Sequence, residues 1–139
     1  MKNYALDANA LITYMENRAG AEKVQHLLDG AEDRKLAVFM SVVNLGEVFY
    51  ATWKMYGEQE ARLRLQQVLG SPILLVTADL DVTVRSAELK AKFKCAYADA
   101  FAASVAVSKR ATLVTADPDF KRFGDKFKVL WLPSHKSIN

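Results

Sequence analysis

Cysteine, histidine, proline and glycine are all scarce in this sequence: its 139 residues include one, two, three and six of them, respectively. The single cysteine, Cys95, has no partner for an internal disulfide. Neither histidine stands near enough to Cys95 to give the spacing of a zinc site. These absences argue against thiol chemistry and against transition-metal chemistry.

Long apolar runs and glycine-rich loops are missing as well. No segment approaches the roughly 18 apolar residues of a membrane helix, and Asp7 comes too early for the apolar region of a signal peptide. We therefore expect a cytoplasmic protein. The sequence contains no phosphate-binding loop, no dinucleotide-binding fingerprint and no histidine placed beside a serine or thiol nucleophile.

The composition is that of one compact domain. Apolar residues make up 51% of the sequence and charged residues 25%. No segment has the composition of a linker, so we place a single domain at residues 1–132 and a C-terminal tail at 133–139.

Positive charge is concentrated toward the C-terminus. Residues 1–89 carry 9 Lys and Arg against 12 Asp and Glu, whereas residues 90–139 carry 10 against 4, for a formal net charge of +3 over the chain. This asymmetry is typical of a surface that faces a polyanion. Lysines scattered over a solvated face would give the same count.

Short apolar runs alternate with longer segments of helical period, which is the pattern of repeated βα units. Strands separated by helices form a parallel sheet through right-handed crossovers. We therefore predict an α/β fold with three layers (α/β/α) around a five-stranded parallel sheet. The predicted strands are 4–6, 36–40, 73–76, 112–115 and 129–132. The predicted helices are 8–16, 21–32, 42–56, 58–69, 80–93, 97–109 and a short one at 118–122.

Acidic residues at the carboxyl ends of such strands are candidates for a site, because open parallel sheets bind ligands at that edge. Asp7 ends the first predicted strand, and Asn9 follows two residues later. Asp117 follows the fourth, two residues after Thr115. Each aspartate is equally suited to cap the helix that follows it, and a strand threonine needs no functional reason.

The string Leu-Val-Thr-Ala-Asp occurs twice, at residues 75–79 and 113–117. Both copies place an aspartate, Asp79 or Asp117, where a strand passes to a helix. Helix capping explains each of them, so neither copy by itself indicates chemistry. Asp117 is in addition followed by Pro118 and Asp119, an ordinary start for a helix.

Two predicted helices carry carboxylates in apolar surroundings. Glu47 lies one turn after Asn44 on the same helix face, with apolar neighbours, so it either reaches solvent or occupies a buried polar site. Asp99 opens a helix that is apolar almost all round and that contains no basic residue. A carboxylate buried there costs several kcal/mol unless its charge is compensated, which a bound cation would do. Alternatively, Asp99 caps the helix or reaches water.

Together, Asp7, Glu47, Asp99 and Asp117 are better explained by hard divalent cations, Mg²⁺ or Mn²⁺, than by nucleophilic or acid–base catalysis. One or two such ions, roughly 3.5–4 Å apart if there are two, activate water and stabilise charge on a phosphodiester. The basic C-terminal residues would then contact the phosphates of a nucleic acid.

Four short motifs in this order resemble the PIN domain and, more narrowly, the VapC toxins of type II toxin–antitoxin systems. They are Asp7-Ala8-Asn9, Asn44-Leu45-Gly46-Glu47-Val48, Tyr97-Ala98-Asp99-Ala100 and Thr115-Ala116-Asp117-Pro118-Asp119-Phe120. The resemblance spans residues 3–132. It departs from the family at Asn9, where a serine is frequent, which leaves every acidic position filled.

The resemblance implies that the strands ending at Asp7 and Asp117 are neighbours, so that the four acids converge as catalytic and metal-binding residues. It implies that Asn9, Asn44, Thr115 and Asp119 surround the metals and that Asp79 is a capping residue. The implied function is a metal-dependent endoribonuclease that inhibits translation, with RNA as substrate, a VapB-like antitoxin as protein partner and a homodimeric assembly.

Three other interpretations remain at this point. The chain can be a solitary RNA-processing nuclease of the same fold, or a non-catalytic module that binds RNA or a protein. Phosphoryl transfer on aspartate also joins strand-end acids to Mg²⁺, but two positions argue against it. Asn9 stands where such a phosphatase has a second acid, and Leu130-Trp131-Leu132 stands where a receiver domain has a lysine.

Overall fold

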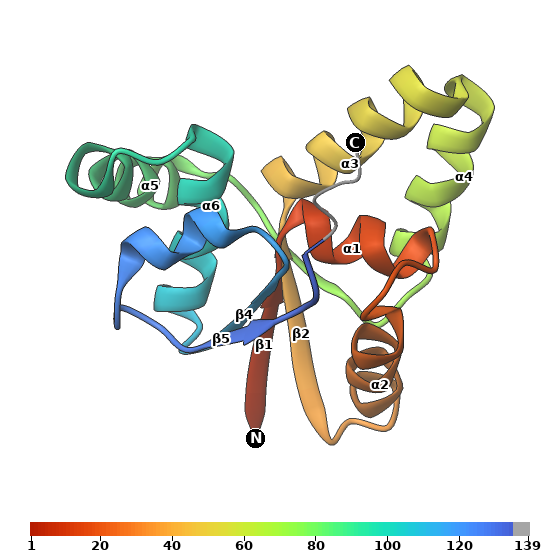
Figure 1. Cartoon of the computed structure of the whole chain (residues 1–139), viewed down its shortest axis with the longest axis horizontal. Coiled ribbons are helices and arrows are strands. Elements are labelled where there is room, and N and C mark those ends of the chain that lie inside the picture. Colours follow the sequence, from red (N-terminus) through yellow and green to blue (C-terminus); the bar gives the residue numbers. More distant parts are fainter. Residues whose placement is uncertain (135–139) are drawn as a thin grey trace.

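A computed structural model describes residues 1–134 and shows a five-stranded, all-parallel sheet (Figure 1). The strand order is β3-β2-β1-β4-β5, and every neighbouring pair is parallel. The strands are β1 (Lys2–Leu6), β2 (Leu36–Ser41), β3 (Leu74–Val76), β4 (Thr112–Thr115) and β5 (Val129–Trp131). The predicted five-stranded parallel sheet is thereby confirmed.

The helices lie close to their predicted positions. They are α1 (Ala8–Met15), α2 (Ala21–Glu32), α3 (Val42–Tyr56), α4 (Glu58–Leu69), α5 (Leu80–Phe93) and α6 (Tyr97–Ser108), with a 3-10 helix, η1 (Pro118–Phe123), after β4. In Figure 1, α1 and α2 lie on one side of the sheet and α5 and α6 on the other, while α3 and α4 project as an arm. This arrangement confirms the three-layer α/β/α architecture.

Alternating side chains on the central strands separate two hydrophobic cores. Leu6 of β1 and Val114 of β4 point into the core shared with α1, α2 and α3. Their chain neighbours Ala5 and Leu113 point into the opposite core, which α6 fills with small side chains. This period of two, with both faces apolar, is what a parallel sheet covered on both sides requires. The two cores hold the carboxyl ends of β1 and β4 side by side.

The arm formed by α3 and α4 turns sharply at Gly57. This residue ends α3 and begins α4 with φ of 96°, a conformation that side chains other than glycine rarely adopt. Its N–H donates to Trp53 O at 2.8 Å, which closes the last turn of α3. The turn sends α4 back along α3 and brings Arg64 toward the end of α1.

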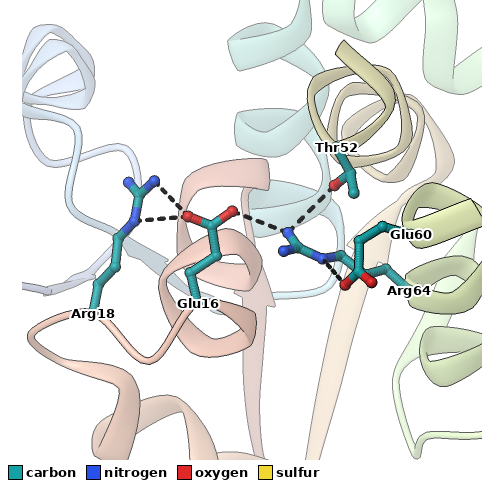
Figure 2. Close-up of polar contacts among 5 residues, drawn as sticks. All are labelled: Glu16, Arg18, Thr52, Glu60 and Arg64. Carbon is teal, nitrogen blue, oxygen red and sulfur yellow. Dashed lines mark hydrogen bonds and ion pairs between the residues drawn. The ribbon is translucent and has the colours of Figure 1, made fainter. Parts of the chain in front are cut away.

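A buried arginine ties the arm to the rest of the domain (Figure 2). Arg64 is 8% exposed and donates to Glu60 at 3.1 Å, to Glu16 at 3.0 Å and to Thr52 at 3.4 Å. Glu16 also accepts from Arg18, so its carboxylate lies between two guanidinium groups. Burial alone would raise the pKa of Glu16, but the hydrogen bonds from Arg64 and Arg18 outweigh it and lower that pKa.

Arg64→Ala is expected to lower the free energy of unfolding by about 2–3 kcal/mol. The change removes a nearly buried guanidinium and leaves the carboxylates of Glu16 and Glu60 without its hydrogen bonds. Arg62→Ala is the matched control on the same helix. It breaks an exposed pair with Glu58 and a cation–π contact with Trp53, at a cost of no more than about 1 kcal/mol. Urea denaturation measures both, and equal losses for the two variants would contradict the anchoring role of Arg64.

Within residues 1–134, no helix is long and apolar enough to cross a membrane. The tail expected at 133–139 lies outside the described residues from position 135 onward.

Candidate metal centre

Two neighbouring strands bring their terminal polar residues together. In the β1–β4 ladder Leu6 is paired with Val114, so Asp7 and Thr115 are the next residues on each strand. The N–H of Asp7 still donates to Val114 O at 3.4 Å. The predicted adjacency of the strands that end at Asp7 and Asp117 is therefore confirmed.

Asp7 is a helix cap that is held almost entirely out of water. It is 4% exposed and is the N-cap of α1, with Oδ1 accepting from the N–H of Ala10 at 2.7 Å. Its Oδ2 accepts from the hydroxyl of Thr115. Burial raises the pKa of Asp7, the two hydrogen bonds lower it, and the nearby charges of Asp99 and Asp117 raise it, so that it stands at about 7. Capping alone does not account for this burial among like charges.

Thr115 and Asn9 fix the backbone that carries Asp117. The Thr115 hydroxyl, fully buried, accepts from the N–H of Asp117 at 2.9 Å while it donates to Asp7. Asn9 accepts from the N–H of Ala116 at 3.2 Å. Both side chains thus connect the end of β1 to the segment after β4. Both therefore contact residues beside the acids, and their role around a metal stays an expectation from the family resemblance.

Asp99 sits in the first turn of α6 without capping it. The N-cap is Ala96, which makes no side-chain cap hydrogen bond. The next seven residues, 100–106, are all buried, as predicted for an apolar helix. Asp99 itself is partly buried, and burial raises its pKa to about 6; Asp117, Glu47 and Asp119 add to the rise, while Arg122 opposes it. The capping alternative for Asp99 is therefore wrong.

Three carboxylates form a tight group at this edge of the sheet. One oxygen each from Asp99, Asp117 and Asp119 lies within 4.8 Å of the others. Asp117 is also the N-cap of η1, accepting from the N–H of Asp119 at 2.9 Å. The tight turn of η1 therefore directs both of its aspartates toward Asp99.

Glu47 approaches the group from α3 and is held by Asn44. Asn44 is 1% exposed, and its Nδ2 donates to Glu47 Oε1 at 3.0 Å and to Ala98 O at 3.1 Å. One amide thereby connects α3 with the first turn of α6, beside Asp99. The Oδ1 of Asn44 is buried and has no hydrogen-bond partner among the described residues. Glu47 is exposed, so its carboxylate faces solvent at this edge.

The structure thus brings the predicted residues into one region. Asp79, which ends the other copy of the pentapeptide that contains Asp117, lies outside that region. Asp79 is exposed and caps α5, accepting from the N–H of Val82 at 2.9 Å. The capping role predicted for Asp79 is confirmed. One oxygen of Asp119, which the resemblance places around the metals, lies within 4.8 Å of oxygens of Asp99 and Asp117. The spacing Asp-Pro-Asp was a signal for this proximity, since a 3-10 turn of three residues keeps both acids near one another.

The donor set suits a hard divalent cation. Carboxylate oxygens are the ligands that Mg²⁺, Mn²⁺ and Ca²⁺ prefer, and three carboxylates converge here with Asp7 and Glu47 beside them. Like charges this close raise one another's pKa, as they do for Asp99. A cation would remove that repulsion and restore the ionised forms. Asp99, Asp117 and Asp119 are the residues placed to hold it.

Arg122 is a charged residue of this region that the sequence analysis did not single out. It lies on η1, and its charge lowers the pKa of Asp99. No sequence pattern marks it, because it is one of several basic residues in a basic segment.

Comparison with known proteins agrees with this geometry. The family model of the PIN domain matches residues 4–126. No curated protein sequence shows a significant match to the chain.

Solved structures share the fold at low sequence identity. VapBC2 from Rickettsia felis, bound to a promoter DNA fragment, matches with a TM-score of 0.72 and 20% identity over 94% of this chain and 98% of that one. VapC20 from Mycobacterium tuberculosis, a sarcin–ricin loop cleaving toxin, gives 0.69 and 16% over 87% and 95%. A toxin–antitoxin complex from Klebsiella pneumoniae gives 0.61 and 23% over 84% and 89%.

Proposed function

This chain belongs to the PIN domain family, and from that membership together with its carboxylate group we propose that it is a metal-dependent endoribonuclease. The observation that carries the proposal is the convergence of Asp99, Asp117 and Asp119 within 4.8 Å, beside a buried Asp7. A structural role does not explain so many acids in one place, none of which forms an ion pair among residues 1–134. Mg²⁺ or Mn²⁺ satisfies their chemistry.

The catalytic and metal-binding residues of the proposal are Asp7, Glu47, Asp99 and Asp117, and Asp119 joins them as a metal-binding residue because one of its oxygens lies within 4.8 Å of Asp99 and Asp117. A bound divalent cation supplies the positive charge that polarises a phosphodiester and lowers the pKa of water. The protein's part is orientation. Thr115 holds Asp7, and Asn44 donates both to Glu47 and to the carbonyl of Ala98, the residue before Asp99.

RNA is the proposed substrate for two reasons. A bound cation makes the acidic site attractive to anions, and the basic C-terminal segment supplies side chains that can contact phosphates. Residues 90–139 hold 10 basic against 4 acidic residues, and they include η1 and the end of α5. Such charge supplies the salt-dependent part of nucleic-acid binding. VapC20, which shares the fold, is described as cleaving the sarcin–ricin loop, and this supports an RNA rather than a DNA substrate.

We further propose that the enzyme is the toxin of a toxin–antitoxin pair and works as a homodimer. Relatives of the same fold crystallised as toxin–antitoxin complexes. A hollow of about 940 Å³ between α1, α2 and α4 supports a protein partner. Its walls combine apolar side chains with Glu22, Asp29 and Glu32 of α2, which suits a segment that is both apolar and basic. A short reading frame next to this gene, encoding such a segment, would favour the toxin role over a solitary nuclease.

The test is multiple-turnover cleavage of structured RNA by the purified wild-type protein. We expect cleavage with Mg²⁺ or Mn²⁺, complete loss with EDTA and recovery when the metal is restored, because the carboxylates repel RNA until a cation is present. Gel analysis of end-labelled transfer RNA and ribosomal RNA fragments measures it.

Two results would contradict the proposal. Cleavage that EDTA leaves unchanged would exclude the metal mechanism. Binding of RNA without cleavage under any tested metal would identify a non-catalytic module on the same fold.

A further inference from the structure

The side chain of Arg122 bridges two segments that carry the acids. Its Nε donates to Asp119 O at 3.1 Å within η1. Its Nη1 donates to Phe93 O at 3.5 Å and to Lys94 O at the end of α5. The guanidinium thus joins the turn that bears Asp117 and Asp119 to the chain that leads into α6 and Asp99.

These backbone contacts place the guanidinium plane at a defined position. Lys94 ends α5 in a left-handed conformation with φ of 55°, so the last carbonyls of α5 turn outward to the arginine. The carbonyl end of a helix carries partial negative charge, which favours a cation there. An arginine that is otherwise exposed is therefore oriented before any ligand arrives.

Arg122 forms no ion pair with the acids beside it. Among the ion pairs of residues 1–134, none involves Arg122. Its guanidinium is nevertheless held at the backbone carbonyl of Asp119, whose carboxylate belongs to the group with Asp99 and Asp117. The carboxylate oxygens are therefore available to bind a metal, and the guanidinium charge is available to bind another anion.

One edge of the guanidinium is open. Arginine has five N–H donors in a fixed plane. Nε and Nη1 bind carbonyl oxygens, whereas Nη2 has no hydrogen-bond partner within the described part of the chain. The N–H groups of Nη2, on an exposed and oriented guanidinium, are charge-assisted donors that a phosphate oxygen accepts from.

We propose that Arg122 binds a phosphate group of the RNA through Nη2, next to the metal centre formed by Asp99, Asp117 and Asp119. This inference rests on the proposed function and extends it to a substrate-binding residue. A fixed cation beside the metal stabilises charge that develops on the phosphate without further reorganisation. It also aligns the RNA strand with the carboxylates.

Lys121 provides a matched control. It is the preceding residue of η1, has the same charge and is likewise exposed. Its Nζ lies 5.8 Å from the ring centre of Trp131 on β5. If the two residues acted only through their positive charge, the loss of either would weaken RNA binding equally. If Arg122 binds a phosphate beside the metal centre, its loss weakens RNA binding more.

The experiment compares Arg122→Ala, Arg122→Gln and Lys121→Ala in the full chain. Mn²⁺ binding without RNA is measured by calorimetry, and binding of a fluorescein-labelled single-stranded RNA by anisotropy with Ca²⁺ at several salt concentrations. We expect both Arg122 variants to bind RNA about 10-fold more weakly, with a salt dependence smaller by about one phosphate contact. Where cleavage is detected, kcat falls about 100-fold. Mn²⁺ affinity stays within about twofold, and Lys121→Ala retains wild-type kcat.

Two outcomes overturn the proposal. A loss of Mn²⁺ affinity in Arg122→Gln would mean that Arg122 holds the carboxylates together rather than binding phosphate. RNA binding equal to that of Lys121→Ala would mean that its charge acts nonspecifically. If the wild-type protein cleaves no RNA, the nuclease proposal fails, while the anisotropy comparison still decides whether Arg122 contacts phosphate.

Discussion

Asp99→Asn is expected to abolish RNA cleavage, with a fall in kcat of about 1,000-fold or more, and to weaken Mn²⁺ binding while the fold remains intact. The variant removes one of three carboxylates whose oxygens lie within 4.8 Å of one another. A divalent cation contributes several kcal/mol of transition-state stabilisation, and each 1.4 kcal/mol is a factor of about ten in rate. Single-turnover cleavage and calorimetry with Mn²⁺ measure the two losses.

Asp79→Asn is the control for this variant. Asp79 ends the first copy of the pentapeptide whose second copy ends at Asp117, but Asp79 is exposed and caps α5. The change is therefore expected to leave kcat and Mn²⁺ affinity at wild-type values, with a stability loss below about 1 kcal/mol because asparagine is also a good N-cap. Full cleavage by Asp99→Asn, or equal loss in both variants, would reject the site.

The metal-free protein is expected to lose stability as the pH rises from about 4 to about 7. Asp7 has its pKa raised by burial from an ordinary 3.8 to about 7, so the folded state binds its proton more tightly than the unfolded state does. The stabilisation that Asp7 gives to the folded state is thus fully present below its pKa in the unfolded chain. It is lost as the pH rises through its pKa in the folded protein. Asp99, with a pKa raised to about 6, acts in the same direction.

Asp7→Asn is expected to remove most of this dependence. At about 1.4 kcal/mol for each pH unit, ionising the buried Asp7 costs the fold about 4 kcal/mol. Asparagine accepts from Ala10 without a charge, so at pH 8 the variant should unfold roughly 10 °C higher than metal-free wild type. It should also be inactive, because the buried charge is what the metal requires.

Thermal unfolding at pH 5 and pH 8, with and without Mn²⁺, checks this prediction. Mn²⁺ at pH 8 should raise the Tm of the wild type, since it binds the folded state alone, and should raise that of Asp7→Asn much less. A Tm of the metal-free wild type that increases from pH 5 to pH 8 would contradict the raised pKa of Asp7 on which this prediction rests.

Much of the fold was predictable because its signals are local. The predicted strand at 112–115 and the predicted helices at 21–32, 42–56, 58–69 and 80–93 agree with the observed elements at both ends. Period-two and period-3.6 patterns are set by residues within a few positions of each other. Alternation of strands and helices then restricts the sheet to parallel pairing.

The roles of individual acids were harder to predict, because capping and metal binding favour the same residue at the same place. Asp7 and Asp117 are both helix caps and members of the acidic region. Asp79 is a cap alone. Arg122 gave no local signal, since its significance comes from carbonyls of Phe93 and Lys94, nearly 30 positions away.

The sequence by itself determined the βα elements, the parallel sheet and the acids that end two of its strands. The neighbourhood of β1 and β4 was implied by the family resemblance and not by local patterns. The tertiary structure alone decided that Asp119 joins Asp99 and Asp117, and that Arg122 lies beside them with no ion pair among residues 1–134. The physical reason is the distance along the chain over which each kind of interaction acts. Backbone propensities and side-chain periodicity act between near neighbours in the chain, whereas burial, repulsion and metal binding depend on distances in space between residues up to 110 positions apart.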